Sequence, residues 1–147
     1  MVKTITDNIS LRLIAVLGPT FVKLSFGSDV SLNKFGRSTK RFAVVPRGAN
    51  TTDGAVGINT LDHRWEITLT DGYVSGPAMA INDDLKLAKV SELQDNALSV
   101  YRDLQLNKSL LSSGILIVNQ LNMNEVVFLE EENVAVLKFE VNIKYKV

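Results

Sequence analysis

The C-terminal stretch from Asn133 to Val147 constrains the fold of this chain more than any other segment. Apolar and polar side chains alternate along it without a break, which is the period of a β-strand with two different faces. The apolar positions are Ala135, Leu137, Phe139, Val141, Ile143, Tyr145 and Val147. A strand of this kind belongs to a sheet with one face on the core and the other toward water or a partner.

Shorter stretches predict the rest of the sheet. Between Leu61 and Thr70 apolar and polar residues again alternate, and Asp71-Gly72 closes that strand as a turn. Lys40 to Val45 predicts a strand that Pro46 ends, because proline cannot donate to a ladder. The segments 115–118 and 126–129 add two strands, and 21–26 could add one in an otherwise irregular region.

A short amphipathic helix is predicted near the start of the chain. Residues 5–17 place their apolar side chains at helical spacing. Thr6, Asp7 or Asn8 can cap its start, and Gly18-Pro19 stops it.

A longer helix is predicted to begin at Asn82 or Asp83 and to run to about Leu106. Asp83 and Asp84 favour the positive end of the helix dipole, which gives them a structural role and no catalytic one. The apolar line of this helix consists of Leu87, Val90, Leu93, Ala97, Val100, Tyr101 and Leu104. This line must pack on a sheet, and the strands that follow it provide one.

Between the strands, Arg47 to Thr60 contains Gly, Asn, Thr, Ala and Asp and almost no large apolar residue. Such a segment cannot bury itself, so we expect a long exposed loop or a hairpin arm. With 147 residues and no linker or repeat, the chain is expected to form one domain over 1–147. The predicted fold class is α+β, with a mainly antiparallel sheet packed against the long helix and the short N-terminal helix.

Composition excludes several classes of function. The chain has no cysteine and one histidine, which removes thiolate nucleophiles, Fe–S clusters and Cys-based or His-rich metal sites. Sixteen basic and sixteen acidic residues cancel, so overall attraction to nucleic acid or to an anionic membrane is not supported. The longest apolar run near the start, 13–17, is too short for a membrane span or a signal sequence. We expect a soluble protein that folds in the cytoplasm.

No catalytic, cofactor-binding or metal-binding constellation emerges. Gly48, Gly54 and Gly57 lack the spacing and the following helix of a phosphate-binding loop, and no serine lies in a nucleophile elbow. His63 neighbours Asp62, but adjacent residues of a strand point to opposite faces, so Asp62 cannot readily orient the ring. We therefore interpret His63 as a buried or boundary residue on the apolar side of its strand, with Trp65. No cofactor is expected.

Two charged clusters are interpreted as ordinary surface. Glu130, Glu131 and Glu132 do not converge as cation ligands must, and they predict a solvated turn that could dock a partner if it repeats around a ring. Lys40, Arg41 and Arg47, with Arg37 nearby, form a basic patch that contains one aromatic, Phe42. Because single-strand binding needs more interleaved aromatics, this patch is interpreted as a solvated strand edge.

Two longer motifs and the C-terminal strands resemble one protein family. The motifs are the run from Phe42 through Val44-Val45-Pro46-Arg47-Gly48 to Ala49 and the run from Thr60 through Asp62-His63-Arg64-Trp65-Glu66 to Tyr73. The ending adds Glu125, Phe128-Leu129-Glu130, Asn133 to Leu137 and Lys144-Tyr145. Over roughly 36–147, together with the N-terminal helix, the sequence resembles the tail terminator or tail-completion proteins of the neck of tailed phages.

The resemblance implies a structural virion protein rather than an enzyme. Such a subunit forms a ring, by resemblance a hexamer, on the head-proximal end of the tail tube, where it stops tube polymerisation and offers a docking surface to a head-completion or neck protein. Genomic DNA passes through the ring without sequence-specific binding, and no membrane is involved. The protein would be located in the virion, at the tail or neck, after assembly in the host cytoplasm.

The exposed polar arm is the segment expected to reach a neighbouring subunit or the tube, because a segment of this length usually has a use. The candidate interface residues are Arg47, Asn50, Thr51, Thr52, Asp53, Arg64, Glu66, Glu130, Glu131 and Glu132.

Three other functions stay open at this stage. The first is a head-to-tail joining or other neck or minor tail protein, which sits on the ring without ending the tube. The second is a small ligand-binding or enzymatic α+β domain with a cleft near His63, Trp65 and Tyr101. The third, a nucleic-acid-binding domain, is disfavoured by the balanced charge.

Overall fold

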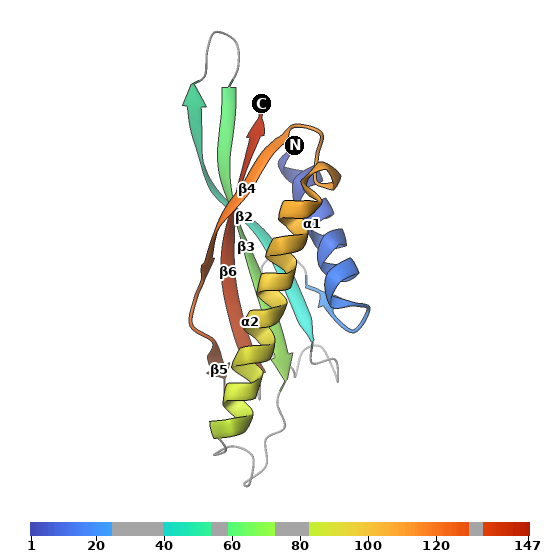
Figure 1. Cartoon of the computed structure of the whole chain (residues 1–147), viewed down its shortest axis with the longest axis vertical. Coiled ribbons are helices and arrows are strands. Elements are labelled where there is room, and N and C mark those ends of the chain that lie inside the picture. The colour runs from blue at the N-terminus through green and yellow to red at the C-terminus, as the bar shows by residue number, and fades with distance from the viewer. Residues whose placement is uncertain (25–39, 54–58, 73–82, 130–133) are drawn as a thin grey trace.

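The computed structural model describes residues 1–24, 40–53, 59–72, 83–129 and 134–147. Within these residues two α-helices lie side by side over one face of a six-stranded, mostly antiparallel sheet, which confirms the α+β prediction (Figure 1). In chain order the elements are α1 (Val2–Leu17), β1 (Val22–Lys23), β2 (Arg41–Asp53), β3 (Asn59–Gly72), α2 (Asp83–Leu106), the 3-10 helix η2 (Lys108–Leu110), β4 (Ile115–Met123), β5 (Val127–Leu129) and β6 (Val134–Lys146).

The sheet is organised around β3 and β6. The strand order is β1-β2-β3-β6-β4, and the short β5 also pairs with β6, along the same edge as β4. β3 and β6 pair antiparallel without interruption from Thr60↔Lys146 to Gly72↔Val134. β1 adds a short parallel pairing to the start of β2, at Arg41 and Phe42.

The core lies between the helices and one face of this sheet. The odd-numbered residues of β3 and β6 point toward the helices, and Trp65 and Phe139 are fully buried there. α1 and α2 complete the core with Ile5, Ile9, Leu13, Leu93, Ala97, Val100 and Leu104. The alternation predicted for β6 is confirmed from Leu137 to Tyr145, but Val134 and Val136 at its start are buried as well, and Val147, beyond the strand, is exposed. Most of the apolar line predicted for α2 is also confirmed.

One member of that apolar line is placed wrongly by the sequence. Leu87 is 64% exposed, because the inward positions at the start of α2 are occupied by two lysines. Lys86 lies over the ring of Phe128 at 5.6 Å, and the Lys89 Nζ donates to Asp71 Oδ2 at 2.8 Å. Counting back from Leu93 in steps of three leads to Val90 and Leu87, which lie progressively further from the buried stripe. Steps of 3.6, the helical period, lead to Lys89 and Lys86.

Pro46 does not end its strand, contrary to the sequence prediction. β2 continues to Asp53, with a shift of register between Pro46 and Ala49. The backbone N–H groups of Val22 and Leu24 donate to the carbonyls of Lys40 and Phe42, so even-numbered residues of β2 turn their backbone groups away from β3. Pro46 has the same parity, and its missing N–H therefore costs no hydrogen bond to β3.

The start of α1 also differs from the prediction, since none of Thr6, Asp7 and Asn8 caps it. The helix begins at Val2, and its N-cap residue, Met1, makes no side-chain capping hydrogen bond. Thr6 Oγ1 instead accepts from Trp65 Nε1 at 2.9 Å, and Asn8 Nδ2 donates to the Leu111 carbonyl at 2.9 Å. These polar groups tie α1 to the sheet and to the segment after η2. Gly18, at φ 88°, ends the helix as expected.

The remaining strands follow the prediction with shifted bounds. β4 runs to Met123, beyond the expected 118, with an irregular register around Gln120, whose φ is 56°. Of the possible strand at 21–26, Val22–Lys23 is observed, and 25–26 lie outside the described residues. The half-buried pattern expected of β3 fails near its end, where Thr68 and Thr70 are buried as well as Leu69.

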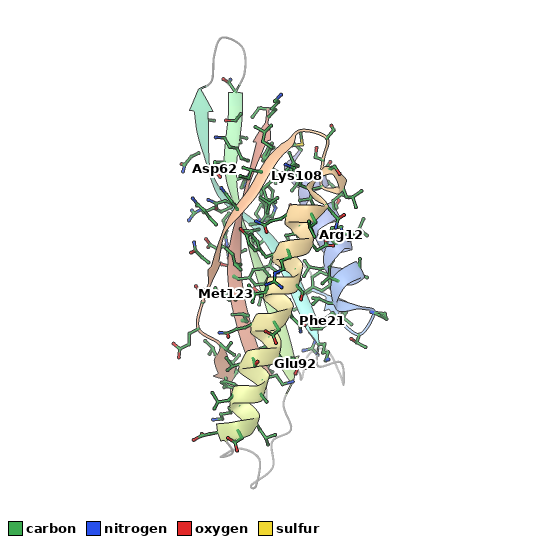
Figure 2. The ribbon with its side chains drawn as sticks, in the orientation of Figure 1. Arg12, Phe21, Asp62, Glu92, Lys108 and Met123 are labelled. Atoms are coloured by element: carbon green, nitrogen blue, oxygen red, sulfur yellow. The ribbon has the colours of Figure 1, made fainter. Side chains whose placement is uncertain are left out.

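A bidentate ion pair joins the two helices. Arg12 of α1, labelled in Figure 2, donates from Nε and Nη2 to the two carboxylate oxygens of Asp103 at 2.8 and 2.6 Å. The hydrogen bonds from Arg12 hold the pKa of the Asp103 carboxyl below its ordinary value. Both side chains are largely buried, which sets this pair apart from the exposed Lys3–Asp7 pair on α1.

We predict that Asp103→Asn lowers the free energy of unfolding by about 1–3 kcal/mol at pH 7, the range for hydrogen bonds to charged groups. Because the folded-state pKa of Asp103 is depressed, its contribution is present above the unfolded pKa of about 3.9 and is lost as the pH falls through the lower folded value. Urea unfolding at pH 7 and pH 3 tests this. The gap between wild type and variant should shrink at pH 3, and Asp7→Asn, in the exposed pair, should change little. An equal gap at both pH values would contradict the assignment.

Candidate interface on the hairpin arm and polar sheet face

The polar stretch after Pro46 forms a hairpin arm rather than a structureless loop, which settles the alternative left open by the sequence. The second half of β2 pairs with the first half of β3, from Ala49↔His63 to Asp53↔Asn59. This end of the hairpin extends beyond both helices and the C-terminus (Figure 1). Residues 47–51 are all exposed, and the side chains of Thr52 and Asp53 lie outside what the structure describes.

A β-bulge marks the base of the arm. Because Pro46 pairs with Trp65 and Ala49 with His63, both Arg47 and Gly48 stand opposite Arg64. A Cβ at position 48 would lie 3.3 Å from Arg64 Nη2, so glycine leaves room for this guanidinium. The extra residue re-aims the strand where the arm leaves the rest of the sheet.

His63 holds this bulge in place from the core side. Its Nε2 lies 2.7 Å from the Arg47 carbonyl, and its Nδ1 lies 3.2 Å from the Tyr145 hydroxyl. A carbonyl only accepts, so we assign the proton to Nε2, and Nδ1 accepts from Tyr145. Burial raises the pKa of the Tyr145 hydroxyl, which keeps this donor protonated at neutral pH. The ring also packs on Trp65 at 4.2 Å between centroids.

The sequence interpretation of His63 as a buried residue beside Trp65 is therefore confirmed. It is buried, and Asp62, next to it on β3, is on the opposite side of the sheet by parity. Its hydrogen-bond partners were not foreseen, because Arg47 and Tyr145 become neighbours only through strand register.

Three of the candidate interface residues come together on the sheet face opposite the helices. Arg47 Nη2 donates to Glu66 Oε1 at 2.9 Å, and this hydrogen bond raises the pKa of Arg47. Arg64 Nη1 lies 3.9 Å from Glu140 Oε2. Glu140 belongs to β6 and was not among the predicted site residues. Its alternation signalled an outward position, but its pairing with Glu66 across the two central strands depends on register.

The other candidates are placed only in part. Asn50 and Thr51 are exposed on β2, where they pair with Asp62 and Leu61. Thr52 and Asp53 complete the strand by backbone pairing. The acidic run 130–132 lies outside the described residues, so its predicted turn and docking role stay predictions.

The interpretation of the basic patch as a solvated strand edge is wrong for Arg41. Arg41 is buried, and burial lowers its pKa. Lys40 Nζ lies 3.7 Å from Glu92 Oε1, and Arg47 is paired with Glu66. Arg37 lies outside the described residues. Local register and helix packing, which sequence order does not reveal, separate these cations.

A small enzyme would need a cleft near His63 and Trp65. Both rings are instead buried among the packed side chains of the core. An apolar groove of about 280 Å³ lies elsewhere, beside β5 and the start of β6. It is lined by Asn124, Glu125, Val127, Leu129, Val136 and Lys138.

In the part of the chain that the structure describes, no three His, Asp or Glu side chains are grouped to hold a metal ion. Over the same residues, no helix has the length and apolar character to cross a membrane.

Comparison with known proteins gives one kind of likeness. No protein-family description and no curated protein matches this sequence. Among solved structures, the fold is similar to that of a chain in the structure described as "Virion of native gene transfer agent (GTA) particle", with a TM-score of 0.56 and 11% sequence identity. The match covers 97% of this chain and 94% of that chain. At this identity the likeness shows a shared fold, over nearly the whole of both chains.

We predict that His63→Phe destabilises the protein by about 1–3 kcal/mol, because the buried Tyr145 hydroxyl and the Arg47 carbonyl lose their partner. His63→Gln should be destabilised less, since its amide nitrogen can reach the position of Nε2 and donate to the Arg47 carbonyl. Hydrogen exchange should speed up at the arm more in His63→Phe than in His63→Gln. Equal exchange at the arm in wild type and both variants would show that His63 does not hold the bulge.

Proposed function

We propose that this chain is a structural protein of a tailed-phage-like virion that caps the head-proximal end of the tail tube. It ends tube polymerisation there and provides the docking surface for the head-completion protein. The observation that carries the proposal is the fold shared, over nearly its full length, with a chain of the gene transfer agent virion. The sequence resemblance to tail terminators supports the finer assignment.

The proposed assembly is a ring of copies of this chain, by resemblance six, located at the neck of the virion after assembly in the host cytoplasm. Its partners are the tail tube protein and a head-completion or neck protein. DNA passes through without sequence-specific contacts, in keeping with the absence of net charge. The role is structural rather than enzymatic, and no cofactor takes part.

The arrangement of the molecule suits a cap. A growing tube end presents unpaired strand edges and loops, and a cap must satisfy them while offering a surface that another tube subunit cannot use. The hairpin arm extends past the helices and is built from small polar residues. Its base is fixed by His63 and by the Arg47–Glu66 ion pair, so the arm is positioned before it meets a partner.

The second candidate is a head-to-tail joining protein that sits on the ring without ending the tube. The same fold likeness favours it, because both roles belong to structural proteins of a virion, and the fold is shared with a chain of one. Electron microscopy of lysates from the parent particle with this gene removed distinguishes the two. A terminator predicts overlong tubes unattached to filled heads, whereas a joining protein predicts normal-length tails lying free. Intact particles would contradict both.

We predict that deleting Asn50 to Gly57 leaves a folded subunit that fails to complement the gene removal. The ladder from Arg41↔Thr70 to Pro46↔Trp65 and the β3–β6 pairing below the arm are retained, so a cooperative thermal transition should persist. The matched control, Asn50→Ala with Thr51→Ala, keeps the arm backbone and should complement at least partly. Normal infectious particles from the deletion would remove the arm from the proposed mechanism.

A further inference from the structure

The two edges of the sheet, at β4 and at β2, differ in how their outward-pointing backbone groups are covered. On β4, the carbonyls of Leu116 and Val118 point away from β6, because the intervening Ile117 pairs with Lys144. The Lys108 Nζ donates to the Leu116 carbonyl at 2.9 Å, and the Gln105 Nε2 donates to the Val118 carbonyl at 3.2 Å. Side chains from η2 and the end of α2 therefore cover two outward carbonyls in the first half of this edge, which hinders pairing with an incoming strand there.

In the part of the chain that the structure describes, no side chain caps the arm portion of β2 in this way. Past the bulge, the pairs Asn50↔Asp62 and Thr52↔Thr60 continue the parity in which β3 bonds β2 through its even-numbered residues. The backbone groups of Ala49, Thr51 and Asp53 therefore point away from β3. Within the described residues no hydrogen bond reaches the outward groups of Ala49 or Thr51, and both residues are exposed.

The side chains of this edge also admit a neighbouring backbone. The residues of this edge are small and uncharged: Gly48, Ala49, Asn50 and Thr51. β2 also contains no lysine, a residue that hinders the pairing of an exposed edge with another chain. The one proline lies before the bulge, where β2 has not yet entered the arm. The bulge is fixed by His63, so the edge is already extended and needs little ordering on binding.

We propose that the outer edge of β2 from Ala49 to Thr51 is a strand-pairing surface for an extended, uncharged segment of the tail tube subunit. The inference rests on the proposed function and names the contact by which the cap engages the tube. A main-chain ladder supplies the affinity, as in other cases of strand addition.

A second copy of this chain is a poorer occupant. Lys108 and Gln105 cover the β4 carbonyls that a neighbouring copy would need at Leu116 and Val118. Pairing β2 with β2 of another copy would be two-fold, and it would give a closed dimer instead of a ring. The capped β4 edge thus leaves the open β2 edge to a different chain.

The test uses the full-length protein and tail tubes purified from particles that lack this gene. Thr51→Pro removes an outward N–H without removing a hydrogen bond to β3, as Pro46 does earlier in the same strand. Thr51→Ala is the matched control, because it alters the side chain and keeps the N–H. In co-sedimentation, Thr51→Pro should bind tubes about tenfold more weakly or worse, and Thr51→Ala should bind like wild type. Thermal unfolding of both variants checks the fold, and Ala49→Pro replaces Thr51→Pro if that variant does not fold.

Each result separates the edge from the proposed function. If wild type binds tubes and the proline variant binds equally well, the strand-pairing surface is overturned and the cap stands. If wild type does not bind tubes, both are overturned. If the proline variant changes the sedimentation of the protein without tubes, the edge holds a second copy, and the tube is the wrong partner.

Discussion

The structure depends on the pairing of β3 with β6. These two strands are hydrogen-bonded along nearly their whole length, and each carries a row of buried side chains toward the helices. Both helices pack on that row, with Trp65 of β3 also hydrogen-bonded to α1 through Thr6. Because β3 and β6 are central, every other strand is positioned relative to them, and so is the hairpin arm that continues β3 past the helices.

From this arrangement two unlike edges arise. The edge at β4 is covered by side chains from the end of α2 and from η2, and the edge at β2 is extended by a bulge and left exposed in the arm. His63 connects the β2 edge to the central strand β6, since one ring nitrogen contacts the β2 backbone and the other contacts Tyr145 of β6. The core thereby sets the geometry of the surface proposed to meet a partner.

The elements that could be predicted from the sequence are those whose signal is local. The alternation of β6 and the periodicity of α2 come from neighbouring residues alone, and both were confirmed over most of their length, with exceptions at the start of each element. Pro46 misled because its cost depends on which side of the strand its nitrogen faces, and Arg41 misled because its burial is set by packing far along the chain. The partnership of Arg64 with Glu140 likewise needs the register of β3 against β6, so the polar face could be anticipated residue by residue but not as a set of pairs.

A firm two-layer base with a projecting arm suits a protein that must be positioned on a larger assembly, which is the role proposed here. The most direct measurement is a cryo-electron microscopy reconstruction of the neck of intact particles. The proposal predicts a ring of this fold at the head-proximal end of the tail tube, with the hairpin arm against the last ring of tube subunits. Finding the fold at another place in the virion, or finding the tube end covered by a different protein, would contradict it.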